Sequence, residues 1–270
     1  AGPNHSLLFN MVNVNDVLYF SATNAANGSE LWKSDGTAAG TVLVKDINPG
    51  SNTSALQNLT SVNAVLYFTA NDGTNGIELW KSDGTAAGTV MLKDIYAGST
   101  TSSPQLLTNV NGVLYFSATD PDNGTELWKS DGTATGTLLV KDIYATVGNA
   151  SPQALTNGNG ILYFSATDAA HGAELWKSDG SAAGTQLIKD IWGGTYYSSP
   201  RNLTDVNGTL YFSAFEPANG QELWKSDGTQ AGTMLLKDLN PGSSSSTPQW
   251  LTALNGNLFF TATDGSNGLV

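Results

Sequence analysis

Several side chains that could bind a ligand gather in one short stretch of the chain. Trp192, Tyr196 and Tyr197 lie within six residues, and Arg201, the only arginine, follows them. His171, one of two histidines, precedes them. Rigid aromatic rings beside a cation and among Asn and Ser side chains are groups that stack on sugar rings or contact peptides. The stretch is therefore a candidate binding site for a carbohydrate or a cell-surface protein.

Two further aromatic residues share a register with Trp192. Tyr96 and Tyr144 precede it at intervals of 48 residues. Each of these rings either adds to the same kind of binding surface or only covers the loop that carries it.

A second series with the same spacing is polar. The spacing of 48 residues joins Gln57, Gln105, Gln153, Arg201 and Gln249, with Phe9 in the first position. In a ring-shaped fold these side chains would surround the mouth of an axial channel. They could hold an anion or a water cluster near the one arginine, or satisfy one another's amides.

Acidic residues form a third series, but they do not point to catalysis. Its members are Asp72, Asp120, Asp168, Glu216 and Asp264. The loop Asp120-Pro121-Asp122-Asn123 could accept calcium, yet it lacks the spacing of a known calcium loop, and a turn-forming role is favoured. With no cysteine and no His-x-x-x-His spacing, we expect no catalytic residues, no metal and no cofactor.

The elements that must position these residues follow from an internal repeat of 48 residues. The string Glu-Leu-Trp-Lys-Ser-Asp-Gly begins at Glu30, Glu78, Glu126, Glu174 and Glu222. In the second copy, runs rich in β-formers at 56–62, 65–70, 78–82 and 90–95 predict four strands, A to D, with Gly, Asn and Asp between them. Four short strands per repeat are typical of β-propeller blades.

The repeat predicts one all-β domain over residues 1–270. The copies occupy approximately 7–47, 55–95, 103–143, 151–191 and 199–239, and a half-copy with strands A and B occupies 247–270. We expect a six-bladed propeller whose last blade is incomplete. The alternative is a five-bladed ring with an extra A–B hairpin.

The residues that every copy shares have structural explanations. The repeated Trp is expected to pack between blades, and Asp35 and its equivalents to cap their own turns. Glu30 with Lys33, and Lys45 with Asp46, could form ion pairs. The connections from D to A and from B to C vary between copies, and both should emerge at the same end of each blade.

The repeated string resembles a known family. Glu30-Leu31-Trp32-Lys33-Ser34-Asp35-Gly36-Thr37 and its copies are similar to the bacterial ELWxxDGT repeat family of large secreted or surface proteins. This resemblance covers nearly the whole chain and implies a surface-associated repeat protein. It supplies no catalytic residues.

Composition narrows the possible partners. The formal net charge of −12 disfavours nucleic acid, because proteins usually contact phosphate backbones with clustered Lys and Arg. No apolar run approaches the length of a membrane span, so no membrane insertion is expected. Few lysines and abundant Asn, Ser, Thr and Gly suggest an extracellular or cell-surface bacterial protein. The absence of cysteine fits either a reduced compartment or a bacterial secreted protein without disulfides.

The sequence therefore predicts a non-enzymatic adhesion or carbohydrate-binding module that acts through the variable loop end. One alternative is a structural subunit that forms homo-oligomers or filaments through its incomplete last blade. A propeller-type glycosidase or lyase is the third hypothesis.

Overall fold

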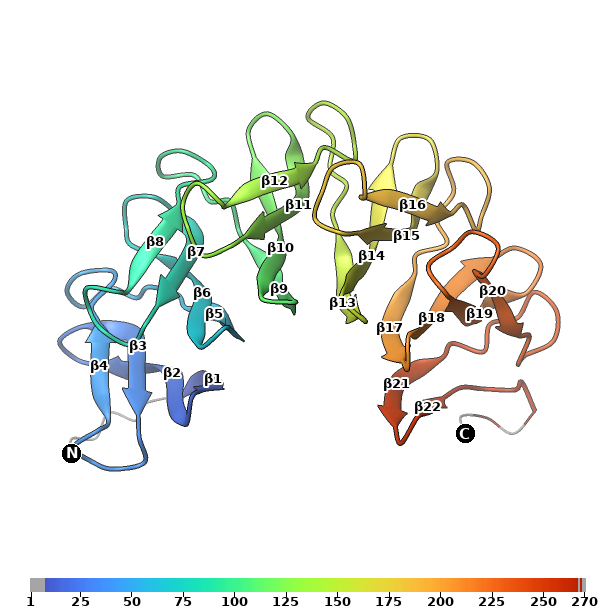
Figure 1. Cartoon of the computed structure of the whole chain (residues 1–270). Coiled ribbons are helices and arrows are strands. Elements are labelled where there is room, and N and C mark those ends of the chain that lie inside the picture. The colour runs from blue at the N-terminus through green and yellow to red at the C-terminus, as the bar shows by residue number, and fades with distance from the viewer. Residues whose placement is uncertain (1–7, 267, 269–270) are drawn as a thin grey trace. The chain divides into compact units, whose positions relative to one another are not determined.

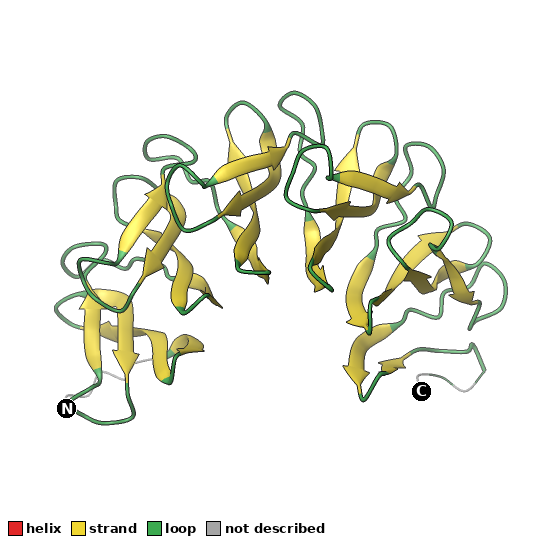
Figure 2. Cartoon of the chain, in the orientation of Figure 1, coloured by secondary structure: helices red, strands yellow, loops and turns green. Residues whose placement is uncertain are grey.

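The structure is a computed structural model and describes residues 8–266 and 268. In this part of the chain all regular elements are strands, joined by turns and loops (Figure 2). None of the described residues forms a helix long and apolar enough to span a membrane.

The strands form six antiparallel sheets, one for each copy of the repeat (Figure 1). The first three blades contain β1 (Phe9–Val14), β2 (Val17–Asn24), β3 (Gly28–Ser34) and β4 (Val42–Lys45); β5 (Gln57–Val62), β6 (Val65–Asn71), β7 (Ile77–Ser82) and β8 (Val90–Lys93); and β9 (Gln105–Val110), β10 (Val113–Asp120), β11 (Gly124–Ser130) and β12 (Leu138–Lys141). Each of these sheets has its four strands in chain order.

The remaining three blades follow the same plan, except that the last has two strands. They contain β13 (Gln153–Gly158), β14 (Ile161–Asp168), β15 (Gly172–Ser178) and β16 (Gln186–Lys189); β17 (Arg201–Val206), β18 (Thr209–Glu216), β19 (Gly220–Ser226) and β20 (Met234–Lys237); and β21 (Gln249–Leu254) and β22 (Asn257–Thr261). The predicted four-stranded repeat and the incomplete sixth copy are thus confirmed.

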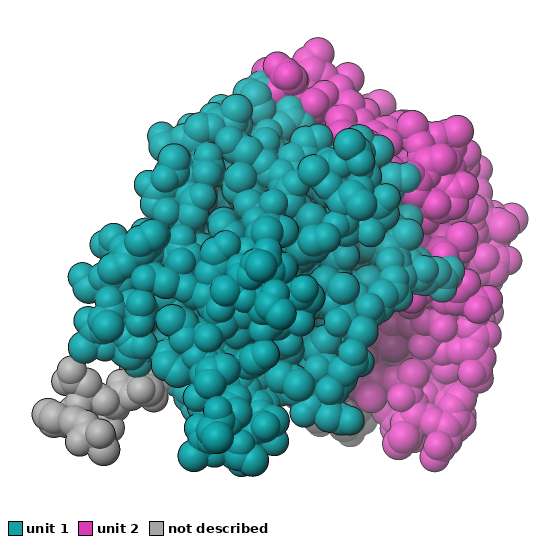
Figure 3. Space-filling model, turned by 60° about the vertical axis from the view of Figure 1, so that its left-hand side comes forward, with its two compact units in different colours: residues 1–121, 128–138 teal, residues 122–127, 139–270 magenta. Residues whose placement is uncertain are grey.

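The described residues divide into two compact units, coloured separately in Figure 3. One contains residues up to 121 together with 128–138, and the other contains 122–127 and 139 onward, so that the division runs through the third blade. Within the first unit β1 contacts β5 and β5 contacts β9, and within the second β13 contacts β17 and β17 contacts β21. Strand A is therefore the strand that meets its counterpart in the next blade of each unit.

Short turns close the A–B hairpins. Asn63 and Ala64 both have positive φ, as do Asn111 and Gly112. Two successive residues with positive φ match the right-handed twist of the flanking strands, and Asn and Gly adopt this conformation at low cost. The A–B connections are therefore tight hairpin turns.

The shared Asp of the C–D turn caps that turn as predicted. Asp131 accepts hydrogen bonds from the Thr133 amide at 2.8 Å and the Thr133 hydroxyl at 2.7 Å. These bonds lower the pKa of Asp131, as equivalent bonds do for Asp83 and Asp227. The side chain replaces backbone partners that a tight turn leaves unpaired.

The shared Trp packs between neighbouring blades, which confirms the second structural prediction. Trp80 belongs to one buried cluster with Val44 and Ile47 of the preceding blade. Trp80 and its three later equivalents are all about as buried. At about 25 cal/mol per Å² of apolar area, burying each indole contributes several kcal/mol.

The expected ion pairs between Glu30 and Lys33 and between Lys45 and Asp46 are wrong. Lys33 donates instead to the Gly84 carbonyl of the next blade, and Lys45 to the Thr89 carbonyl, both at 2.8 Å. Glu30 is fully buried. The carbonyl oxygens of Gly84 and Thr89 lie in the C–D connection of the second blade. Without the lysines of the first blade these oxygens would lose water and lack a hydrogen-bond donor.

Glu30 and its equivalents join strand C to the connection that follows strand D. Glu30 accepts hydrogen bonds from the amides of Ile47 at 2.9 Å and Ser54 at 3.1 Å. Glu78, Glu126, Glu174 and Glu222 accept the same pair of amides in their own blades. The Glu of the repeated string is therefore the anchor of the variable D–A connection.

Replacing Lys189 by Met is expected to lower the free energy of unfolding by about 1–3 kcal/mol. Lys189 donates to the Thr233 carbonyl at 2.7 Å and lies 5.9 Å from the centre of the Trp224 ring. Met keeps the apolar stem but removes both interactions. Lys237→Met is the matched control, because Lys237 has the same register but is exposed. Chemical denaturation would measure both, and equal losses would contradict the cross-blade role.

Candidate functional site

The candidate site lies on the fourth and fifth blades. It is formed by the D–A connection between β16 and β17, by the B–C loop between β14 and β15, and by the strand ends beside them. The predicted meeting of these two variable loops is confirmed: a Cβ on Gly172, the residue of β15 that directly follows the B–C loop, would lie 1.9 Å from the Tyr196 carbonyl oxygen. Gly172 has a φ of +66°, so both its conformation and its surroundings require glycine.

Aromatic rings stack at the centre of this site. The rings of Trp192 and Tyr196 are nearly parallel, at 13°, with centroids 4.9 Å apart. Phe215, at the end of β18 in the next blade, lies tilted 4.9 Å from Trp192. Trp192 is thus held between its own loop and the neighbouring blade, while Tyr196 is 57% and Tyr197 54% exposed. Tyr196 and Tyr197 are therefore the exposed rings of the site, and Trp192 supports the ring of Tyr196.

The loop that carries these rings is tied down at both of its ends. Glu174 accepts hydrogen bonds from the Ile191 amide at 3.0 Å, and from the amide and hydroxyl of Ser198 at 3.0 and 2.5 Å. Asp190 accepts from the Gly194 amide at 3.0 Å. Fixed ends limit the conformational entropy that the tyrosines lose on binding.

His171 is oriented by one carboxylate. Its Nδ1 lies 2.9 Å from Asp168 Oδ2, and Asp168 also accepts from the amides of Ala170 and His171. The hydrogen bond to Asp168 raises the pKa of His171, with further contributions from the charges of Asp168, Asp190 and Glu174. The turn-forming role predicted for Asp168 is confirmed, and Asp72 has the same role through the amides of Thr74 and Asn75.

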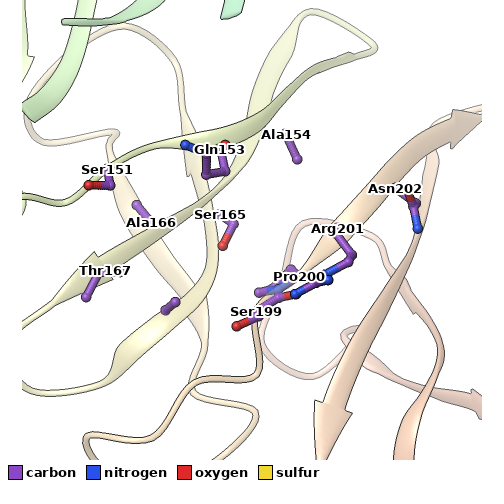
Figure 4. A pocket seen from close by; sticks show the side chains of 11 residues that line it. Ser151, Gln153, Ala154, Ser165, Ala166, Thr167, Ser199, Pro200, Arg201 and Asn202 are labelled. Atoms are coloured by element: carbon purple, nitrogen blue, oxygen red, sulfur yellow. The ribbon is translucent and has the colours of Figure 1, made fainter. Parts of the chain in front are cut away.

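A pocket of about 580 Å³ opens beside the start of strand A in these two blades (Figure 4). Gln153 and Ser165 line it from the fourth blade, and Arg201 lines it from the fifth, where its Nε donates to the Ser199 carbonyl at 3.4 Å. A smaller equivalent of about 360 Å³ lies between the first two blades and is lined by Phe9 and Gln57. Arg201 therefore adds a cation to a pocket that the repeat itself produces.

The structure brings together only part of each predicted series. All four glutamines, Gln57, Gln105, Gln153 and Gln249, are exposed and stand at the first residue of a strand A, as Arg201 does. Tyr96 and Tyr144 are half-buried on their own D–A connections. The Tyr144 ring contacts the position of Gly148 in its own loop, where a Cβ would lie 1.9 Å from the ring. Among the D–A connections in the part of the chain that the structure describes, the fourth is the one whose aromatic residue stacks with other rings.

Phe215 is the site residue that the sequence interpretation missed. Its register holds Thr23, Asn71, Thr119, Thr167 and Thr263 in the other copies. A single aromatic among small polar residues was the available signal. Its connection with Trp192 depends on two blades packing side by side, which spacing within one copy does not show.

Residues 8–266 and 268 contain no cluster of side chains that would support metal binding. No three His, Asp or Glu side chains of this part gather so that they could hold an ion. Asp120, in the loop considered for calcium, is buried at the end of β10.

Comparison with known proteins supports the fold. No protein-family model and no curated protein matches the chain. The chain is similar to a crystal structure of puromycin hydrolase, with a TM-score of 0.53 and 12% identity over 95% of this chain and 42% of that one. A mutant of that hydrolase complexed with PGG matches with a TM-score of 0.51 and the same identity and coverage.

This chain spans less than half the length of the hydrolase chains that it matches. At this identity the likeness concerns the fold alone. Together with the repeated four-stranded sheets, it assigns the chain to the all-β propeller class, with six blades of which the last has two strands.

Proposed function

We propose that the protein is a non-enzymatic extracellular adhesion module that binds a carbohydrate through Tyr196 and Tyr197. The observation that carries this proposal is the stack of Tyr196 on Trp192 and of Trp192 against Phe215, with both tyrosines more than half exposed. An exposed aromatic ring whose other face is already packed offers a rigid, amphipathic surface at small entropic cost.

The charges around the site favour a particular class of sugar. Arg201 is the one arginine of a chain with a net charge of −12. A polyanionic glycan would be repelled by such a chain, whereas a neutral saccharide, or one with an isolated carboxylate for Arg201, would not. Ser151, Ser165 and Gln153, which line one pocket with Arg201, are hydrogen-bonding groups suited to sugar hydroxyls.

Tyr196→Ala is expected to weaken binding of the best ligand found on a glycan array at least tenfold, because it removes the exposed ring of the stack. A loss of one stacking contact of about 1.4 kcal/mol corresponds to this factor. Titration of the purified ligand would measure the change.

Tyr144→Ala is the matched control, since it removes the aromatic residue of the preceding connection, where no cluster forms. It should change affinity less than twofold. An array without any bound glycan, or equal effects of the two substitutions, would contradict carbohydrate binding at this site.

A further inference from the structure

The pocket between the fourth and fifth blades has a counterpart between the first and second blades. The residues that line the counterpart lie three copies of the repeat earlier, so that Phe9 corresponds to Gln153 and Gln57 to Arg201. The volumes of the two pockets are about 580 Å³ and about 360 Å³. The repeat therefore produces both pockets, and the residues that differ between them decide what each can hold. Three of these differences bear on ligand binding.

The first difference removes a side chain that bridges neighbouring blades. Asn10 donates to the Leu56 carbonyl at 2.8 Å, and Asn side chains of two later copies make the same bond across their own blade boundaries. Ala154 stands at this register in the fourth blade, so the Pro200 carbonyl lacks that donor. Ala154 keeps a φ of +53°, which Asn adopts at lower cost, so backbone stability does not explain the alanine.

The second difference removes the partner of a buried hydroxyl. In the first blade the hydroxyls of Ser21 and Ser29 share a hydrogen bond at 3.0 Å. In the fourth blade Ala173 stands at the register of Ser29, and the hydroxyl of Ser165 has no hydrogen-bond partner among the described residues. Ser165 is 5% exposed and lines the pocket (Figure 4). A buried hydroxyl without a partner is destabilising, so this one is available to a ligand.

The third difference adds a cation. Arg201 stands at a register where four other copies have Gln. Its Nε donates to the Ser199 carbonyl at 3.4 Å, which turns the side chain back along Ser199 and Pro200 (Figure 4). Its terminal nitrogens have no partner among the described residues, and none of the described residues that line the pocket is acidic. Free N–H groups in one plane are the donors that bind both oxygens of a carboxylate.

We propose that this pocket binds a small hydroxycarboxylate, a ligand with one carboxylate and hydroxyl groups on nearby carbons. The carboxylate accepts from the terminal nitrogens of Arg201. One ligand hydroxyl donates to the Pro200 carbonyl in place of the missing Asn, and another ligand oxygen accepts from the Ser165 hydroxyl. The volume of about 580 Å³ suits a ligand of this size, since small-molecule pockets measure roughly 300–1,000 Å³.

Two sources supply this chemistry. A uronic acid such as glucuronate supplies it as a residue of a glycan, and glycerate supplies it as a free acid. The inference rests on the proposed function only in pairing Arg201 with a carboxylate, and it requires no ligand contact by Tyr196.

Titration of the 270-residue chain with glucuronate, followed by the NMR shifts of its amides, tests the pocket. Saturable one-to-one binding is expected, with the largest shifts at residues 153–154, 165–167 and 199–202. Glucose has the same ring without the carboxylate, and acetate has no hydroxyl, so each should bind at least tenfold more weakly. Glycerate that binds as tightly as glucuronate would identify a free hydroxy acid as the ligand, whereas tighter binding of glucuronate would identify the uronic acid.

Variants distinguish the pocket from its charge alone. Arg201→Gln, which restores the residue of other copies, should weaken glucuronate binding at least tenfold. Ala154→Asn should do the same without a change in charge, because the restored amide reaches the Pro200 carbonyl and fills the pocket. Gln57→Arg is the matched control: it places the same cation in the first pocket, where the bridge from Asn10 remains, and should create no second site. Circular dichroism melts verify that the three variants fold.

Several results would overturn the proposal. They are no saturable binding, binding of glucose or phosphate as tight as that of glucuronate, and full affinity in Arg201→Gln or Ala154→Asn. A second site in Gln57→Arg would likewise show that the cation alone suffices. If glucuronate binds in this pocket while Tyr196→Ala leaves the binding of arrayed glycans unchanged, only the adhesion role of the tyrosines is contradicted.

Discussion

Glu174→Ala is expected to lower the free energy of unfolding by about 3–4 kcal/mol and to abolish detectable sugar binding. Glu174 is fully buried and accepts from the amides of Ile191 and Ser198 and the hydroxyl of Ser198. Alanine leaves these donors without a partner, and each unsatisfied buried donor costs about 1–3 kcal/mol. The loop that they fix carries Trp192 and Tyr196, so the stack loses its support.

Glu174→Gln distinguishes the hydrogen bonds from the charge. Glutamine keeps the carbonyl oxygen and the shape of the side chain, and burial already raises the pKa of Glu174 toward the neutral form. We expect it to cost less than half as much as alanine and to retain binding. Chemical denaturation and ligand titration measure the two effects, and an alanine variant as stable as the parent chain would refute the anchoring role.

Thermal stability is expected to fall as the pH rises from about 4.5 to 7. Burial raises the pKa of Glu30 and of Glu126 from 4.5 to about 7, against the lowering effect of the amide hydrogen bonds that each accepts, while nearby Asp46 and Asp142 raise it further. Because the pKa of each glutamate is higher in the folded state, the folded protein binds more protons than the unfolded chain between pH 4.5 and about pH 7. The associated stability is fully present below pH 4.5 and is lost as the pH passes through about 7. The loss is about 3 kcal/mol for each group.

The opposite trend is expected at lower pH. Hydrogen bonds from Thr side chains and amides lower the pKa of Asp83, Asp131 and Asp227 below 3.8. The stability that these groups contribute is present above pH 3.8 and is lost as the pH falls through their pKa values in the folded state. The melting temperature should therefore be highest at about pH 4–5.

Melting curves from pH 3 to 8 measure both trends. Glu30→Gln combined with Glu126→Gln should flatten the fall between pH 4.5 and 7, because glutamine does not titrate. A melting temperature that rises steadily from pH 5 to pH 7 would contradict the raised pKa values of the buried glutamates.

Much of the blade could be predicted because its signals are local. The Asn-Gly turn at Asn111 and the cap at Asp131 depend on backbone preferences and on contacts within a few residues. The roles of Glu30 and Lys33 could not be predicted in this way. Three residues apart in the string, they suggested an ion pair, but strand C sends the Glu30 side chain to its own D–A connection and the Lys33 side chain to the next blade.

The candidate site could likewise be predicted only in part. Aromatic content and the single arginine marked the stretch from Trp192 to Arg201. That Trp192 packs on Phe215, that Tyr196 presents the open face, and that Gln153 shares a pocket with Arg201 were not visible in the sequence.

The sequence by itself determined the repeat, the strands of each blade, their turns and the incompleteness of the last one, because these follow from side-chain alternation and from turn chemistry at short range. The tertiary structure alone decided which exposed rings form one surface and which buried groups anchor it. Those contacts join residues of different strands and neighbouring blades, and their partners are set by blade packing, which the 48-residue spacing repeats but does not describe.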